Sequence, residues 1–239
     1  MSSSGKRFKK LNGKKRKRST KSGESSRRLA MDIASAADTF VAPSPYSGAL
    51  RYLPTSQKVT LRYAQKFTIS ASIAQAGTWV FRANGMFDPD LTGSGHQPRG
   101  FDQLMTMYDH FQVIGSKITI MSAQPNISSV IGVCIKDRST VSTDYEDYLE
   151  ENPAFNTIGM VGNDGEPMAL VANYSQKKFF GQGSLEEQFE GDVSSDPSEG
   201  AFFHVYQTAI TDSSVSTNSH VVVIDYIAVL TEPKIPIKS

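Results

Sequence analysis

The feature that most constrains the fold is an alternation of apolar and polar residues that begins at Lys58. Its apolar members are Val59, Leu61, Tyr63, Phe67 and Ile69. Alternation with a period of two places one set of side chains on each face of a β-strand. Because the apolar face must be covered by a second layer, the pattern predicts a layered β structure.

Six further stretches have the composition and length of strands. They are residues 78–84, 111–121, 130–136, 168–179, 201–211 and 220–230. The last stretch is apolar on both faces, which predicts a position in the middle of a sheet or beneath a partner subunit.

Two short helices are predicted between these strands. Residues 98–110 place Phe101, Leu104, Met105 and Tyr108 on one helical face, with Pro98 in the first turn. Residues 143–151 begin with Thr143 and Glu146, which have the spacing of a capping box.

Seven or eight strands with little helix predict an all-β fold. The specific expectation is a single eight-stranded antiparallel jelly roll, a β-sandwich with one or two short helices in its loops. Three segments are expected: a disordered basic arm over 1–30, an extended linker over 31–57, and the jelly-roll shell domain over 58–239.

The charge of the chain is divided between two opposed segments. Residues 1–30 hold twelve basic residues against Glu24, a net charge of +11, while the remaining 13 basic and 23 acidic residues give −10. The overall charge of +1 conceals this asymmetry, which is typical of a basic tail that binds nucleic acid.

The predicted nucleic-acid contacts of the arm are its lysines and arginines, which bind phosphates without reading sequence. They are Lys6, Arg7, Lys9, Lys10, Lys14, Lys15, Arg16, Lys17, Arg18, Lys21, Arg27 and Arg28. The unbroken run from Lys14 to Arg18 is also a candidate nuclear localisation signal for host importin. A solubilising tail, or an import signal alone, is the alternative interpretation.

The first strand offers a second basic surface. Lys58, Arg62 and Lys66 are spaced four residues apart, so all three point to the same face. They are predicted to continue the nucleic-acid surface of the arm, and an ordinary solvated strand face is the alternative.

Catalytic and metal sites are not predicted, and neither is a cofactor. The histidines His96, His110, His204 and His220 lack metal-ligand spacing, and Ser94, His96 and Asp102 are a triad by residue type only. Asp88 and Asp90 flank Pro89, which favours a turn over a shared calcium site.

Cys134 is the single cysteine, so no intrachain disulfide is possible. Residues 221–230 are too short to span a membrane, and Asp225 interrupts them.

Several motifs in the middle of the chain, taken in order, are similar to one known family. They are the stretches FRANGMFDPD at 81–90, GHQPRGFDQ at 95–103, YDHF at 108–111 and GSKI at 115–118. Residues 79–120 thereby resemble capsid proteins of circular Rep-encoding single-stranded DNA (CRESS-DNA) viruses. The resemblance implies a single jelly roll, self-assembly into an icosahedral shell of the simplest (T=1) symmetry, an arm directed into the particle, and a structural role for His96, Gln97 and Asp102.

The expected function is therefore that of a non-enzymatic viral capsid protein. It would assemble with itself, package a single-stranded genome, most readily DNA, through its arm, and be found in the virion and in the host nucleus during assembly. The alternative is a nuclear nucleic-acid-binding or chaperone-like β-domain with a basic tail.

Overall fold

The computed structural model describes residues 53–72, 75–122, 129–151, 155–161, 168–181, 185–209 and 215–235. The predicted arm over 1–30 lies outside the described residues, and so does the predicted linker as far as residue 52. None of the helices in the described ranges is long and apolar enough to cross a membrane.

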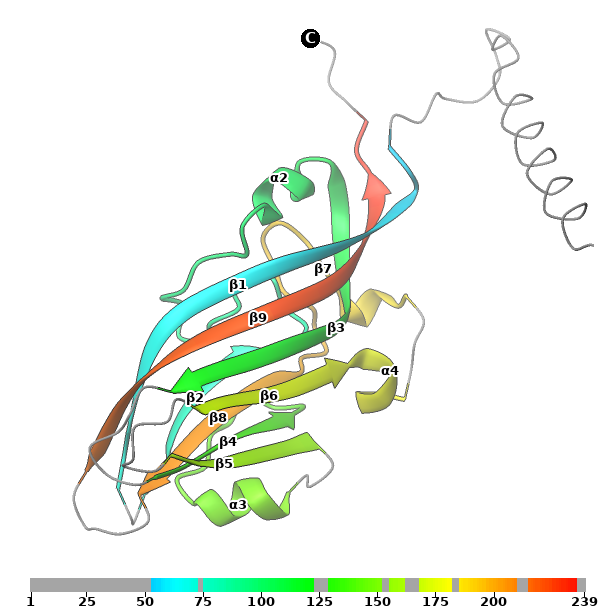
Figure 1. Ribbon diagram of the computed structural model, residues 1–239. Coiled ribbons are helices and arrows are strands. Elements are labelled where there is room, and N and C mark those ends of the chain that lie inside the picture. Colours follow the sequence, from blue (N-terminus) through cyan, green and yellow to red (C-terminus); the bar gives the residue numbers. More distant parts are fainter. Residues whose placement is uncertain are drawn as a thin grey trace, which may run out of the picture. The chain divides into compact units, whose positions relative to one another are not determined.

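The described strands form two antiparallel sheets (Figure 1). The first sheet has the order β1-β9-β3-β6, from Ser56–Ala71, Ser216–Pro233, Tyr108–Ser122 and Met168–Ser175, with the short β7 (Glu190–Gly191) beside β3. The second sheet has the order β2-β8-β4-β5, from Gly77–Arg82, Phe202–Ala209, Ser129–Lys136 and Asn156–Val161.

The pairing of these strands confirms the predicted jelly roll. Leaving out β7, the first strand pairs with the last, β2 with β8, β3 with β6, and β4 with β5. The pairs β3–β9 and β4–β8 then join these four ribbons into two sheets. A long antiparallel hairpin rolled into two facing sheets is the arrangement that defines a jelly roll.

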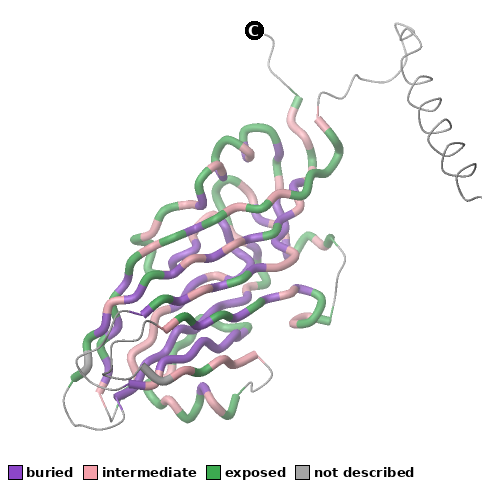
Figure 2. Tube along the Cα trace, in the orientation of Figure 1, coloured by how far each residue is buried: buried purple, intermediate pink, exposed green. Residues whose placement is uncertain are grey.

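The core lies between the two sheets and follows the alternation of the strands (Figure 2). On β1, Tyr63, Phe67 and Ile69 are buried as predicted, and Phe67 meets Phe81 of β2 edge to face with ring centroids 5.3 Å apart. The predicted central position of the last strand is also confirmed, because β9 lies between β1 and β3.

The helix predicted over 98–110 is wrong in extent. The observed α2 (Phe101–Met105) starts after Gly100, whose φ of 91° lies in the left-handed region that glycine adopts readily. Tyr108 belongs to β3 instead, where it pairs with Pro233 of β9. Tyr108 lies seven residues after Phe101, a spacing that fits one face of a helix. Its backbone instead pairs with β9 in the antiparallel sheet.

The second predicted helix is present, but its predicted capping box is wrong. α3 (Tyr145–Glu150) has Asp144 as its N-cap, and the Asp144 carboxylate accepts from the backbone N–H of Glu146 at 3.0 Å. Asp144 stands one residue closer to the helix than Thr143 does, and its carboxylate satisfies a free N–H of the first turn.

Two further differences concern the strands. The segment predicted as a single strand over 168–179 is β6 followed by α4 (Gln176–Phe179), where Gln176 accepts a hydrogen bond from Gln112 Nε2 at 2.7 Å. β5 was not predicted, because Asn156 and Gly159 belong to residue types that are depleted in strands. A short 3-10 helix (Glu187–Phe189) precedes β7.

Candidate nucleic-acid interface

The predicted basic residues fall into two groups. The twelve arm residues, including the candidate localisation signal from Lys14 to Arg18, lie outside the described residues, so their role stays a prediction. Lys58, Arg62 and Lys66 lie on β1, and all three are exposed while their neighbours Tyr63 and Phe67 are buried. The structure therefore places these three cations on the outward face of the first sheet.

Arg62 has a partner that the sequence did not suggest. Its Nε donates to Asp225 Oδ1 at 2.6 Å, and its Nη2 donates to Oδ2 at 3.0 Å, across the β1–β9 register. The hydrogen bond and charge of Arg62 hold the pKa of the Asp225 carboxyl below its usual range. The Asp225 side chain is 19% exposed and that of Arg62 is 69% exposed, so the arginine still presents most of its surface to solvent.

A fourth cation joins this pair from the other side of β9. Lys117 of β3 is opposite Asp225 in the ladder, and its Nζ lies 3.7 Å from Asp225 Oδ2. Around these side chains the sheet surface forms a hollow of about 430 Å³, which Thr60 and Asn173 also line. The hollow adjoins Gly115, at the point where a β-bulge shifts the β3–β9 register between Val113 and Gly115.

α3 packs on the outward face of the second sheet, over β8 and β4. Tyr148 of the helix stacks on Tyr206 of β8 with ring centroids 4.8 Å apart and planes 7° apart. Gly132 of β4 makes room for this stack, because a Cβ there would lie 2.3 Å from the Tyr206 ring. Residues 136–151 carry six carboxylates against Lys136 and Arg138, so the covering layer is acidic.

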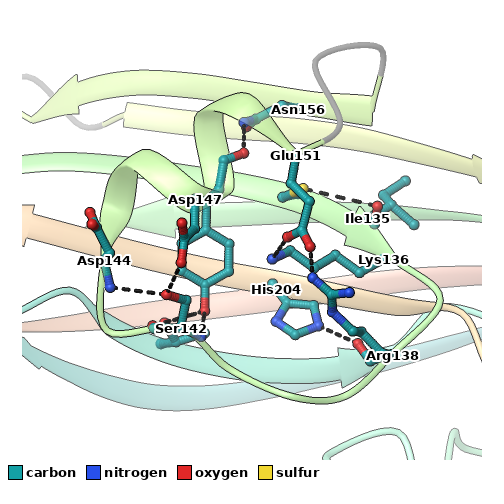
Figure 3. Close-up of polar contacts among 12 residues, drawn as sticks. Ile135, Lys136, Arg138, Ser142, Asp144, Asp147, Glu151, Asn156 and His204 are labelled. Carbon is teal, nitrogen blue, oxygen red and sulfur yellow. Dashed lines mark hydrogen bonds and ion pairs between the residues drawn. The ribbon is translucent and has the colours of Figure 1, made fainter.

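A charged cluster fixes α3 to the end of β4 (Figure 3). Glu151 pairs with both Lys136 and Arg138, and the buried Lys136 ammonium lies 4.2 Å from the centroid of the Tyr148 ring. His204 Nε2 donates to the backbone carbonyl of Arg138 at 2.7 Å. Burial lowers the pKa of His204 to about 4, so it packs as a neutral side chain.

The other residues considered for chemistry have structural contacts. The ring nitrogens of His96 lie 2.7 Å from the Gln97 carbonyl oxygen and 3.0 Å from that of Ala64, with no triad geometry involving Ser94 among the described contacts. Asp90 accepts from the backbone N–H of Thr92 at 3.0 Å and from Trp79 Nε1 at 3.1 Å, which favours the turn interpretation. Within the described ranges, no group of three or more His, Cys, Asp or Glu side chains could hold a metal ion.

Known proteins are similar to this chain in structure alone. No family model and no curated protein matches the chain. Among solved structures, Mud crab tombus-like virus matches 80% of this chain and 96% of its own at 10% identity, with a TM-score of 0.49. Turnip yellow mosaic virus matches 83% and 92% at 13% identity, with a TM-score of 0.45. The T=1 subviral particle of a Penaeus vannamei nodavirus capsid protein deletion mutant matches 77% and 98% at 10% identity, with a TM-score of 0.43. Because all three TM-scores are below 0.5 and the identities are 10–13%, the assignment of the jelly roll rests on the strand pairing described above.

Proposed function

We propose that this protein is a viral capsid protein that assembles into a small closed shell and packages a single-stranded genome through its basic N-terminal segment. The observation that carries the proposal is the combination of a jelly-roll body with a segment of net charge +11 in the first thirty residues. Jelly rolls also form lectin and cupin domains. A cupin-type metal site needs clustered ligands, and the described residues contain none.

The charge division supports a packaging role. The segment 1–30 attracts polyanions, whereas the rest of the chain, at −10, repels them on average. If about sixty copies close the shell, as in the smallest icosahedral symmetry, their arms supply about 660 positive charges. That number would neutralise on the order of 660 phosphates, with the excess left to cations and to basic residues of the body.

The finer parts of the proposal rest on the sequence. The similarity of residues 79–120 to CRESS-DNA virus capsid proteins supports a circular single-stranded DNA genome. Replication of such a genome in the nucleus accords with an import signal at Lys14–Arg18 that binds importin. The protein would then occupy the host nucleus during assembly and the virion afterwards, without acting as an enzyme.

Electron microscopy with nuclease typing tests this proposal. The purified full chain is imaged by negative stain, and nucleic acid extracted from any particles is treated separately with DNase and RNase. Uniform round particles with DNase-sensitive contents are expected. RNase-sensitive contents would overturn the DNA genome alone. A monomer or small oligomer that binds nucleic acid without forming particles would favour the nuclear binding or chaperone-like domain.

A further inference from the structure

The outward faces of the two sheets differ in what covers them. α3 packs over β4 and β8 of the second sheet and leaves Ile158 of β5 half-exposed, while the first sheet has several partly exposed apolar side chains, among them Met121, Val171 and Val221. These side chains come from three different strands, and the ladder places Met121 directly opposite Val221. Within the described residues, the face of β1, β9, β3 and β6 is therefore a broad surface that carries both apolar and charged groups.

The charge on this face is opposite in sign to that of the body as a whole. From the pair Lys58–Val229 to the pair Lys66–Val221, the outward cations are Lys58, Arg62, Lys66 and Lys117. Two carboxylates lie on the described strands of this face within the same span, namely Asp225 opposite Arg62 and the half-buried Glu190 of β7 in the row of Lys58 and Val229. Four cations against two anions give this face a local charge of +2, although residues 31–239 as a whole carry −10, and this positive charge favours a polyanion as the occupant.

The hollow between Arg62 and Lys117 retains donors for such a ligand. A guanidinium has five N–H donors, and Arg62 uses two of them on Asp225. The Lys117 side chain is 50% exposed, and its ammonium lies 3.7 Å from the same carboxylate. Asn173 and Thr60 add neutral polar groups at the rim of the hollow. A fork of N–H groups beside an ammonium is a suitable arrangement for phosphate oxygens.

We propose that this hollow binds a phosphate group of single-stranded nucleic acid, with Arg62 and Lys117 as the contacting cations and Asp225 as an internal competitor for them. The inference rests on the proposed packaging function and adds to the arm a defined site on the folded body. Asp225 positions both cations and reduces their net charge, so each contact is weak and reversible. A phosphate that enters the hollow shares the Arg62 fork with the carboxylate.

The remaining cations extend this site into a track. Lys58, Arg62 and Lys66 are four residues apart along β1, which corresponds to about 13 Å between neighbours at ~3.3 Å per residue. Phosphates of a stacked strand are about 3.4 Å apart along its axis, so one in about four would meet a cation of β1. Thr60 and Ala64 lie between these cations on β1, and the exposed Met121 and Val221 lie beside Lys66, where they offer bases apolar contact that does not read sequence.

A charge-matched set of variants tests the site. Asp225→Asn frees Arg62 and Lys117, and Lys117→Gln removes one contact. The controls make the same charge changes away from the hollow, with Glu146→Gln on α3 and Lys178→Gln on α4, both exposed in the wild type. Binding of a fluorescent 20-nucleotide oligo-dT to the unassembled full chain, verified by sedimentation, is followed by anisotropy between 50 and 300 mM salt. Melting temperatures check that each variant folds.

Opposite shifts are expected at the hollow. Lys117→Gln should reduce the magnitude of the log–log salt slope by about 0.7, the value for one phosphate contact on a single strand. Asp225→Asn should tighten binding by about 3-fold near 50 mM salt. It should also increase the magnitude of the log–log salt slope by about 0.7. Shifts of the same size in the two controls would mean that only total charge matters, and they would overturn the site.

A second measurement uses filled particles and does not depend on a variant that folds. Ultraviolet cross-linking of the packaged nucleic acid, followed by peptide mass spectrometry, should yield adducts on β3 around Lys117 to Met121 in addition to any on the arm. Adducts on the arm alone would overturn the hollow and leave packaging by the arm intact. Failure of the wild type to form particles would instead count against the proposed function, so the two failures are distinguishable.

Discussion

Acidification from pH 7 to pH 4 should destabilise the fold through two buried histidines. His220 donates from Nε2 to Gln207 Oε1 at 3.0 Å and accepts at Nδ1 from the Ser122 hydroxyl at 2.9 Å. His204 donates from Nε2 to the Arg138 carbonyl, and its Nδ1 has no hydrogen-bond partner. Burial lowers the pKa of both side chains to about 4, from an unfolded value of 6.5.

The sign and size of the effect follow from these pKa values. The folded state keeps both imidazoles neutral, whereas the unfolded chain takes up protons once the pH falls below 6.5, so stability is lost between pH 6.5 and pH 4. Each histidine contributes at most about 1.4 kcal/mol per pH unit, or ~3.4 kcal/mol over the whole window. Together they could remove about 7 kcal/mol, which is comparable with the total stability of a typical domain.

Urea unfolding at half-unit steps from pH 7.5 to pH 4 measures this loss, with the fluorescence of Trp79, the single tryptophan, as the signal. The pKa of Asp88 and of Asp196 is raised by burial, which opposes the effect, so the comparison needs variants. His204→Gln and His220→Gln should each reduce the pH slope by up to half. A double variant whose stability falls as steeply as the wild type between pH 6.5 and pH 4 would refute the reasoning.

Four further predictions concern the arm and the packing of α3. Deleting residues 1–30 should leave shells that form but are poorly filled, as measured by sedimentation and the 260/280 nm absorbance ratio; normally filled shells would show that the body packages the genome. Binding of the full chain to single strands should give a log–log salt slope of about −7 or −8, and a slope near zero would contradict the role of the arm. Residues 1–30 fused to a large fluorescent reporter should carry it into the nucleus, and cytoplasmic retention would argue against the signal at Lys14–Arg18. Gly132→Ala should cost about 1–3 kcal/mol in urea unfolding, because its Cβ would meet the Tyr206 ring, and unchanged stability would contradict that packing.

The fold could be predicted from the sequence because alternation reports burial directly. Tyr63, Phe67 and Ile69 lie in the core as their spacing on β1 requires, and the two-sided apolar character of 220–230 identified a central strand. Short helices and strands were harder to predict from the sequence. Tyr108 has the spacing of a helical residue but pairs in a sheet, and β5 contains residue types that disfavour strands.

The candidate site was predictable only in part. The periodicity of β1 placed Lys58, Arg62 and Lys66 on one face, but it could not show which residues of other strands stand beside them. Register decides that question, and Asp225 reaches Arg62 across 163 residues of sequence. Without the register, Asp225 was only an interruption of an apolar stretch, and Lys117 was one lysine within the GSKI motif.

The position of β9 has a consequence for synthesis of the chain. β9 follows every other described element in sequence, yet it lies between β1 and β3, so the first sheet cannot close until its last strand has left the ribosome. During that interval β1 is a sixteen-residue strand without its partner, a state in which nascent copies can pair with one another. Lysine and arginine on such a strand oppose this pairing by charge repulsion. Lys58, Arg62 and Lys66, exposed on β1, are therefore expected to oppose pairing between nascent copies of the chain.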